Sequence, residues 1–272
     1  MFSIRASSLT DYYDCSRRAA TKIFRDQIGA AGYQLATLRK MIGAAIGTGA
    51  HAAMEYTLRE KMKSGGLGFN DEAEARAIDA LQEAVNEGVT YDFKVAQTLK
   101  GAQEQVLRKV KEIRTAIAPQ LRPLDVEIQL RAEYRGIEVT GTLDIREKEG
   151  PADLKSGKFK RQNGPQYGLY GMLADTHYEK STRIREIYLA TAPLDKPQPK
   201  AEFADYNVED SARFARSMLD NIIDDHAKFE NTGGDRFSFR ANPASLLCGP
   251  KYCPAYGTTF CKEHLNKEKV YG

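Results

Sequence analysis

Two carboxylates and a lysine lie close together near the middle of this 272-residue sequence, in a pattern that suits metal-assisted hydrolysis. Asp153 and Lys155 are two residues apart in a short apolar segment, so on a strand both side chains leave one face while Leu154 points into the core. Asp144 ends the preceding predicted strand, within hairpin reach. Carboxylates brought together at strand ends repel each other unless a hard cation such as Mg²⁺ or Mn²⁺ lies between them. Lys155 beside that ion can orient or deprotonate the attacking water and stabilise charge on a phosphorane-like transition state.

A histidine and a glutamine–tyrosine pair can complete such a site. His51 follows the small residues 47–50, which let its helix approach another backbone closely, and its imidazole can complete an O,O,N metal site. Gln166 and Tyr170 are four residues apart on the helix after the Lys155 strand, so both project from one side of it. The ordinary alternatives are a packed histidine, a solvated glutamine, a half-buried tyrosine and, for Asp153 and Lys155, a surface ion pair.

Basic residues between the Lys155 strand and the next predicted helix can neutralise phosphates beside the metal. They form the compact cluster Lys158, Lys160 and Arg161, and Arg17, Arg18 and Lys22 on the first predicted helix extend it. A solvated charge run is the alternative. Any contact with nucleic acid must come from such local patches, because 40 Lys and Arg against 37 Asp and Glu leave a net charge of only +3.

The composition is that of a globular protein. Hydrophobic residues make up 42% of the chain beside 22 glycines, which excludes disorder as the dominant state. The longest stretch without a formal charge, 41–54, contains glycines, Thr48 and His51, and the N-terminus turns polar before any apolar run develops. We therefore expect a soluble, cytoplasmic protein without a secretory signal or membrane span.

The elements that must position these residues change type at about residue 120. Hydrophobic spacing predicts helices first: one opening at the Ser8-Leu9-Thr10-Asp11 capping pattern and carrying Cys15, one from about 43 to the 60–63 region, and two around 78–85 and 106–117. Strict alternation then predicts strands over 124–134, 137–145 and 152–156. A helix over 165–177, strands over 184–191 and 202–206, and a helix over 208–229 follow. This order predicts an α/β fold with a mixed sheet flanked by helices.

We expect one domain over 1–272, because no repeat or long linker divides the chain. Its parts are N-terminal helices over 1–60, a helical insertion without a motif over 61–120, an α/β core over 121–230, and a cysteine-rich segment over 231–272. No Gly-x4-Gly-Lys-[Ser/Thr] phosphate loop is present, so the chain carries no helicase motor.

Taken in order, these motifs resemble the PD-(D/E)XK nucleases, specifically the RecB-like branch. Gly-x-x-x-His occurs at 47–51, Gly-x-x-Asp at 141–144, Asp-x-Lys at 153–155 and Gln-x-x-x-Tyr at 166–170. The resemblance implies a restriction-endonuclease-like fold. It also implies the following roles: His51, Asp144, Asp153 and the Leu154 carbonyl hold Mg²⁺ or Mn²⁺, Asp144, Asp153 and Lys155 are catalytic, and Gln166 and Tyr170 place the DNA, with Glu127 a less certain contributor.

The cysteines resemble those of a subset of this branch that includes the AddB nuclease domain and the CRISPR-associated "Cas four" exonucleases. Cys15 precedes the histidine motif, and Cys248, Cys253 and Cys261 follow the core. In those relatives four thiolates hold a [4Fe-4S] cluster that staples the chain ends together. The spacings here are looser than the usual pattern, which leaves open a zinc site, with His264 in place of a cysteine, and two disulfides as the third option.

The resemblance implies a stand-alone metal-dependent DNase of a bacterial cell or a phage-infected host. We expect an exonuclease that acts on single-stranded or end-frayed DNA in recombination, repair or phage DNA processing, with a recombination or replication protein as a possible partner. The alternatives are a non-catalytic nucleic-acid-binding or assembly subunit with a structural metal cluster, and a structure-specific endonuclease. The sequence leaves exonuclease polarity, the number of active-site metals and the oligomeric state open.

Overall fold

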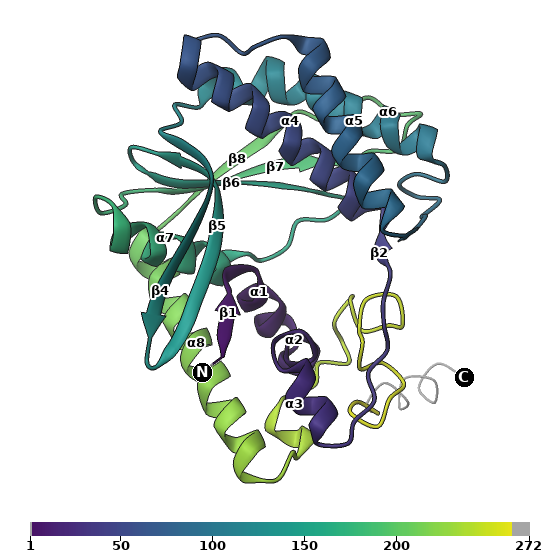
Figure 1. Cartoon of the computed structure of the whole chain (residues 1–272), viewed down its shortest axis with the longest axis vertical. Helices are drawn as coiled ribbons and strands as arrows, with labels where there is room; N and C mark the ends of the chain where they lie inside the picture. The colour runs from purple at the N-terminus through teal and green to yellow at the C-terminus, as the bar shows by residue number, and fades with distance from the viewer. Residues whose placement is uncertain (1, 263–272) are drawn as a thin grey trace.

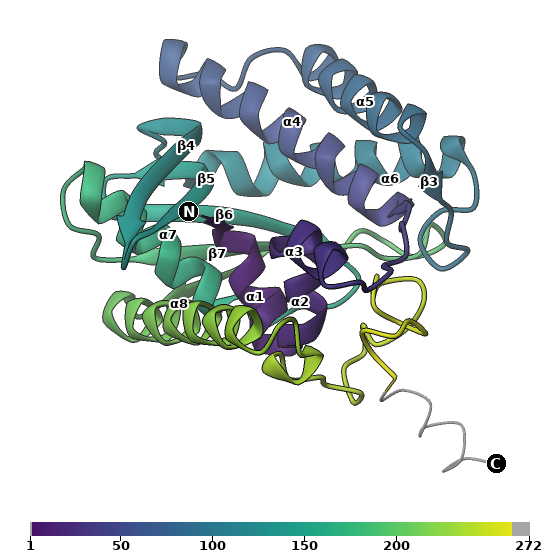
Figure 2. The ribbon, with the colours of Figure 1, turned by 60° about the horizontal axis from the view of Figure 1, so that its bottom comes forward.

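A mixed β-sheet lies between two groups of helices (Figures 1 and 2). The computed structural model describes residues 2–262. Its main sheet has six strands, namely β1 (Ser3–Arg5), β4 (Asp125–Tyr134), β5 (Ile137–Glu147), β6 (Gly150–Gly157), β7 (Ile184–Ala190) and β8 (Glu202–Tyr206). A small second sheet pairs β2 (Lys40–Met41) with β3 (Val89–Thr90). The predicted α/β class, with a mixed central sheet flanked by helices, is confirmed.

The helices form one layer on each side of this sheet (Figure 2). On one side lie α4 (Ile42–Ser64), α5 (Asn70–Asn86) and α6 (Leu99–Glu112), the last continued by a π-helical turn (Ile113–Ile117) and a 3-10 turn (Ala118–Gln120). On the other lie α1 (Ala6–Asp14), α2 (Ser16–Ile23), α7 (Gly164–His177) and α8 (Val208–Asn231), with α3 (Arg25–Ala30) at the end of α2. A 3-10 turn (Arg236–Ser238) precedes an irregular cysteine segment, 239–262. No helix within the described residues is both long enough and apolar enough to cross a bilayer.

Strand β5 is the centre of the sheet because it pairs with three other strands. Along one edge it runs antiparallel to β4 over nearly its whole length. Along the opposite edge it pairs with β1 through residues 138–140 and with β6 through residues 145–147. Residues 141–144 therefore have no ladder partner on that edge within the described chain. The sheet opens at this point, and β6 continues in parallel pairing with β7.

The first predicted helix is wrong in its detail. The chain forms β1 before it, α1 begins at Ala6 rather than at the capping pattern, and no side chain caps its N-terminus. The helix also breaks at Cys15, whose φ of −158° and ψ of 102° are extended, and α2 starts afresh at Ser16. A strand of three residues such as β1 is too short to be predicted from alternation. It forms because an edge of β5 is available for pairing.

A second acid-x-Lys pattern, Asp92-Phe93-Lys94, lies between β3 and α6. Asp92 pairs with Ala96 in an isolated bridge and lies 2.7 Å from Lys251 Nζ in the cysteine segment. In this copy the carboxylate therefore takes part in a surface ion pair.

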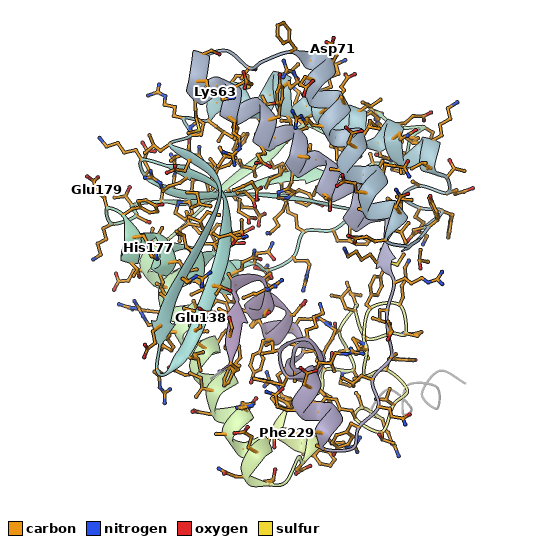
Figure 3. All side chains as sticks on the ribbon, in the orientation of Figure 1. Lys63, Asp71, Glu138, His177, Glu179 and Phe229 are labelled. Atoms are coloured by element: carbon orange, nitrogen blue, oxygen red, sulfur yellow. The ribbon has the colours of Figure 1, made fainter. Side chains whose placement is uncertain are left out.

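Two histidines outside the acidic cluster, His226 and His177, take part in packing and a backbone contact. His226 on α8 is 7% exposed and stacks on Phe24 at a ring-centroid distance of 4.3 Å. His177 is the last residue of α7, and its Nε2 lies 2.8 Å from the Arg131 oxygen (Figure 3).

A buried lysine anchors the 61–120 region to the sheet. Lys109 on α6 is 0% exposed, and its Nζ donates to the backbone oxygens of Leu189 at 3.0 Å and Ala190 at 3.2 Å, at the end of β7. Gln105, one turn earlier, donates to the Ala192 oxygen at 2.7 Å. Burial, with a contribution from Arg108, lowers the pKa of Lys109 from 10.5 to about 7. This region is therefore a cover packed on the sheet.

Replacing Lys109 with Met should flatten the dependence of the free energy of unfolding on pH between about 7 and 10. In this window the unfolded wild-type chain binds a proton at Lys109 that the folded chain does not. Its free energy of unfolding therefore rises with pH, by up to about 1.4 kcal/mol per pH unit from this residue, and that gain is lost as pH falls through about 7. Urea unfolding of both proteins at several pH values measures the two slopes.

The matched control is Lys111→Met, because Lys111 is exposed on the same helix. Its slope should equal that of the wild type. A Lys109→Met slope equal to both would mean that the buried amine stays charged in the folded protein.

Candidate active site

The gap in the β5 ladder is where the acidic residues gather. Asp144 lies at the end of the unpaired stretch 141–144, and its Oδ2 accepts the backbone N–H of Leu154 on β6 at 2.7 Å. That N–H would otherwise be left without a strand partner on this side, since the β5–β6 ladder ends at Ala152. The Asp144 carboxylate therefore bridges the two strands at the point where they separate.

Asp153 and Lys155 leave the same face of β6, as the alternation predicts. Leu154 between them is 1% exposed and packs with the α4 residues Ala50, Met54 and Leu58. Lys155 Nζ lies 2.7 Å from Asp153 Oδ2. Asp153 is 2% exposed, and neither of its oxygens receives a well-directed hydrogen bond from the described residues. A buried carboxylate in this state is costly unless a further cation satisfies it.

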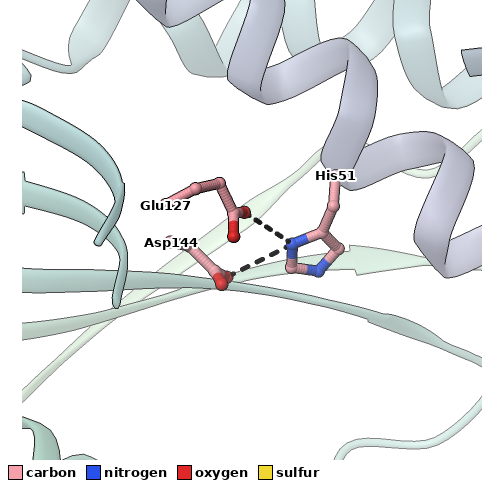
Figure 4. A group of neighbouring side chains, drawn as sticks. All are labelled: His51, Glu127 and Asp144. Carbon is pink, nitrogen blue, oxygen red and sulfur yellow. Dashed lines mark ion pairs between the residues drawn. The ribbon is translucent and has the colours of Figure 1, made fainter. Parts of the chain in front are cut away.

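His51 and Glu127 complete the acidic cluster from opposite sides (Figure 4). His51 projects from α4, and its Nδ1 lies 3.5 Å from Asp144 Oδ2 and 3.7 Å from Glu127 Oε1. Ligand atoms of His51, Glu127 and Asp144 all lie within 4.8 Å of one another, the spacing of a metal-ion site. The structure therefore gives Glu127, the least certain of the predicted contributors, a place in the tightest ligand set.

Glu127 reaches this cluster through an unusual backbone conformation. Its φ is +54°, which is rare for a residue other than glycine and is uncommon within a strand. The β4–β5 register places it opposite Asp144, and it is the one position between Asp125 and Tyr134 without a ladder partner. Local strain of this kind persists only where the surroundings fix it, and it is concentrated at functional sites.

The charges of the cluster shift one another's proton affinities. Burial raises the pKa of Asp153 to about 6, although Lys155 opposes the rise. Burial also raises the pKa of Asp144, against the effect of His51 and Lys155. Burial by itself would lower the pKa of His51, but Asp144, Glu127 and Asp153 outweigh it and raise that pKa to about 9. The pKa of Lys155 is likewise raised, by Asp153 and Asp144 against burial, so its ammonium stays charged.

A further buried carboxylate, which the sequence reasoning missed, lies beside this site. Glu186 on β7 is in register with Asp153, is 4% exposed, and helps to raise the pKa of Lys155. It accepts hydrogen bonds from the Tyr167 hydroxyl and from Asn163 Nδ2. The sequence did contain a signal for Glu186. It is a charged residue at a position of the predicted strand 184–191 where an apolar core residue is expected.

The motif glycines are required by close packing. A Cβ on Gly141 would lie 2.9 Å from Tyr170 Cε1 and 3.0 Å from Leu173 Cδ1, and one on Gly47 would lie 3.2 Å from Ser156 Oγ. Gly141 thus makes room for the tyrosine of another motif, and Gly47 lets α4 approach β6 directly after Lys155.

Gln166 and Tyr170 lie on one side of α7, as predicted, but they contact each other. Gln166 Nε2 donates to the Tyr170 hydroxyl at 2.8 Å, and the two residues are 4% and 6% exposed. Tyr170 also lines a cleft of about 380 Å³ along β4 and β5, together with Arg5 and Arg131. Burial, with the charges of Asp153 and Asp144, raises the pKa of Tyr170, so its hydroxyl stays protonated.

The predicted extension of the basic cluster by Arg17 and Arg18 is wrong, because both side chains are buried. Arg17 and Arg18 are 2% and 1% exposed; Arg17 donates to the Phe239 oxygen, and Arg18 pairs with Asp14 at 2.6 Å. The other cations remain partly exposed but are mostly paired: Lys22 with Asp11 at 2.6 Å, Arg161 with Asp11 at 2.8 Å, and Lys160 with Glu202 at 2.5 Å. Lys158 is exposed and forms no ion pair within residues 2–262.

All four cysteines line one cavity between the N-terminal helices and the cysteine segment. Cys15 comes from the break between α1 and α2, and Cys248, Cys253 and Cys261 from segment 239–262. None of the four is in a disulfide. His264, the predicted substitute ligand, lies outside the described residues.

Comparison with known proteins supports this architecture. The family model of the PD-(D/E)XK nuclease superfamily matches residues 3–257. A crystal structure from Eubacterium rectale, of a protein provisionally named an exonuclease, superposes with a TM-score of 0.57 at 9% identity, over 90% of this chain and 86% of that one. This likeness shows the fold alone. The structure of SSO0001, with a TM-score of 0.31 at 13% identity over 64% of this chain and 73% of that one, is too distant to support any conclusion. No curated protein matches the chain.

Replacing Gly141 with Ala should destabilise the protein by about 1–3 kcal/mol, because the new methyl group overlaps a buried ring and a buried leucine. Gly29→Ala is the matched control. Gly29 lies in α3 with nothing within 4 Å of the added Cβ, so that change should be neutral or stabilising by up to about 1 kcal/mol. Urea unfolding measures both. Equal stability of the two variants would contradict the assigned contact between the motifs.

Proposed function

The chain belongs to the PD-(D/E)XK nuclease superfamily, and from this premise we propose that it is a Mg²⁺- or Mn²⁺-dependent deoxyribonuclease of the RecB-like branch, acting as an exonuclease on single-stranded or end-frayed DNA. Recombination, repair or phage DNA processing would be its setting. Three observations support this proposal. Membership of the superfamily supports a nuclease, and the order of the sequence motifs and the carboxylates gathered at the β5 gap support the finer assignment.

The observation that carries the metal-dependent mechanism is the state of Asp153. This carboxylate is almost fully buried beside Asp144, and although its Oδ2 lies 2.7 Å from Lys155 Nζ, its Oδ1 has no hydrogen-bond partner among the described residues. A divalent cation satisfies such oxygens and removes the repulsion between them. We assign its ligands to His51, Glu127 and Asp144, together with Asp153 and the Leu154 carbonyl, a set of oxygens and one imidazole nitrogen that suits Mn²⁺ or Mg²⁺.

The residues around this site divide the work of phosphodiester hydrolysis. When bound, the cation polarises the phosphate and lowers the pKa of an attacking water. Lys155 is held by Asp153 and stays protonated, so it can donate to the phosphate oxygens as negative charge builds up on them. Glu186 keeps Tyr167 and Asn163 in place behind Lys155. Tyr170, held by Gln166, faces the cleft along β4 and β5, where it can position the strand.

We propose that the cysteines hold a [4Fe-4S] cluster. All four thiols line one cavity, which is the observation that supports a shared metal centre. The order of the cysteines, one before the histidine motif and three after the core, resembles that of the iron–sulfur exonucleases and favours the cluster over zinc.

A nuclease assay tests the proposed activity. With Mg²⁺ or Mn²⁺ we expect loss of end label from linear single-stranded DNA and survival of circular single-stranded DNA, and EDTA should abolish cleavage. Lys155→Ala should lower the cleavage rate by at least ~100-fold while Mn²⁺ binding is retained, because it removes a charge that acts in the transition state. Glu127→Gln should instead raise the Mn²⁺ concentration needed for half-maximal rate.

The other outcomes discriminate between the alternatives. Degradation of circular DNA would replace the exonuclease with an endonuclease. DNA binding without cleavage by the wild type, with or without metal, would favour a non-catalytic binding subunit. Full activity of Lys155→Ala would remove the assigned mechanism.

Anaerobic purification tests the cluster. We expect about four irons and four sulfides per chain with a visible absorption band, both lost in Cys261→Ser. Leu247→Ala is the matched control, since Leu247 lines the same cavity without a thiol, and it should keep its iron. One zinc per chain and no visible band would overturn the assignment.

A further inference from the structure

A second cleft opens beside the active site. The active-site cleft, of about 550 Å³, is lined by His51, Glu127 and Lys155. The neighbouring cleft, of about 570 Å³, begins directly after it along β6, at Ser156 and Gly157, and continues over the loop 158–162. The two clefts share Ala44 and Ser156 as lining residues. An extended ligand, such as a nucleic-acid strand, that lies in the first cleft can therefore continue into the second.

The second cleft is lined by exposed rings from three separate parts of the sequence. Phe159 in the loop after β6 is 70% exposed, Tyr13 on α1 is 47% exposed, and Tyr252 in the cysteine segment is 39% exposed. Leu246 beside them is 91% exposed. Large apolar side chains gathered at one exposed hollow mark a binding surface. Tyr13 is held edge-on by Phe214, at a ring-centroid distance of 5.1 Å, so its ring is already positioned.

The charges at this cleft suit a strand of phosphates. Lys158 Nζ lies over the Phe159 ring, 5.3 Å from its centroid, and forms no ion pair within residues 2–262. Lys251 Nζ lies over the Tyr252 ring at 5.4 Å while it pairs with Asp92. The acidic residue that lines the cleft, Asp14, is neutralised by Arg18 at 2.6 Å. Two of the three rings, Phe159 and Tyr252, thus carry a nearby cation, which matches a ligand that alternates flat bases with anionic phosphates.

We propose that this cleft is a base-stacking subsite, in which Phe159, Tyr252 and Tyr13 hold unpaired nucleobases of the strand whose phosphate lies at Lys155. The proposal rests on the proposed nuclease function and adds the reason for a single-strand preference. Bases in a duplex already stack on one another and cannot offer their faces to protein rings, whereas unpaired bases can. Every base has such a face, so the subsite selects strandedness and not sequence.

A tryptophan at position 159 provides a direct probe, because the chain has no tryptophan of its own. With metal-free Phe159→Trp protein, titration with a single-stranded oligonucleotide should quench the tryptophan fluorescence. An oligomer of abasic sugar-phosphate of equal length should not quench it. A blunt duplex of the same sequence should not quench it either.

Binding by variants measures the contribution of the rings. In metal-free protein, Phe159→Ala should weaken binding of the base-bearing single strand roughly 5- to 150-fold and leave binding of the abasic oligomer unchanged. Phe69→Ala is the matched control, since Phe69 is 79% exposed and lines neither cleft, and it should bind as the wild type does. Phe159 is exposed, so its removal should not affect folding.

Failure of this inference can be told from failure of the proposed function. If Phe159→Ala binds base-bearing and abasic strands as the wild type does, or the tryptophan is quenched equally by duplex, the subsite is overturned even where the wild type cleaves DNA. If the wild type cleaves nothing but the ring-dependent binding persists, the subsite stands and the nuclease function falls.

Discussion

The hydrogen bond from the Leu154 N–H to Asp144 Oδ2, 2.7 Å long, is the contact on which the site depends. It forms because β5 is shared along one edge by β1 and β6, which leaves residues 141–144 without a strand partner. The carboxylate takes the place of the missing ladder and is thereby fixed between the strands. Once Asp144 is fixed, His51 above it and Glu127 opposite it in the hairpin have a defined place to converge. The geometry of the metal site thus follows from sheet topology.

Burying these charged groups is unfavourable, and contacts in the layers on both sides of the sheet offset that free-energy cost. Asp153, Glu186 and Lys155 are charged or polar groups in or near the core, and each depends on the others for compensation, because an isolated buried charge is strongly unfavourable. The rigid cover of α4 to α6 holds His51 over the cluster, and the buried amine of Lys109 fixes that cover to β7. The motif glycines allow the close approaches that bring these layers together. A site with this much opposed charge needs a stiff frame on both sides.

Alternation of apolar residues over many positions was sufficient to predict β4 and β5, and the two-residue spacing of Asp153 and Lys155 on the short strand β6 predicted the face from which both project. The four-residue spacing of Gln166 and Tyr170 on a helix likewise placed them on one side of α7. The positive φ of Glu127, the break at Cys15 and the short strand β1 were not predictable, since each results from contacts with segments far away in the sequence. The burial of Arg17 and Arg18 was also not predictable from charge. The sequence alone does not distinguish an arginine that binds phosphate from one that donates to a backbone oxygen, as Arg17 does to that of Phe239.

Those buried arginines explain how the chain ends are joined to the core. The N–H of Arg17 and the hydroxyl of Ser16 both donate to the Arg240 oxygen, and Asn242 Nδ2 donates to the Asp14 oxygen at 2.8 Å. These bonds tie the break between α1 and α2 to segment 239–262 through protein groups alone, and they place Cys15 at the same cavity as the other three thiols. The same segment carries Tyr252 to the cleft beside Lys155. The segment that carries three of the four cysteines therefore also lines the cleft beside Lys155, so one short stretch of irregular chain connects the cysteine cavity with that cleft.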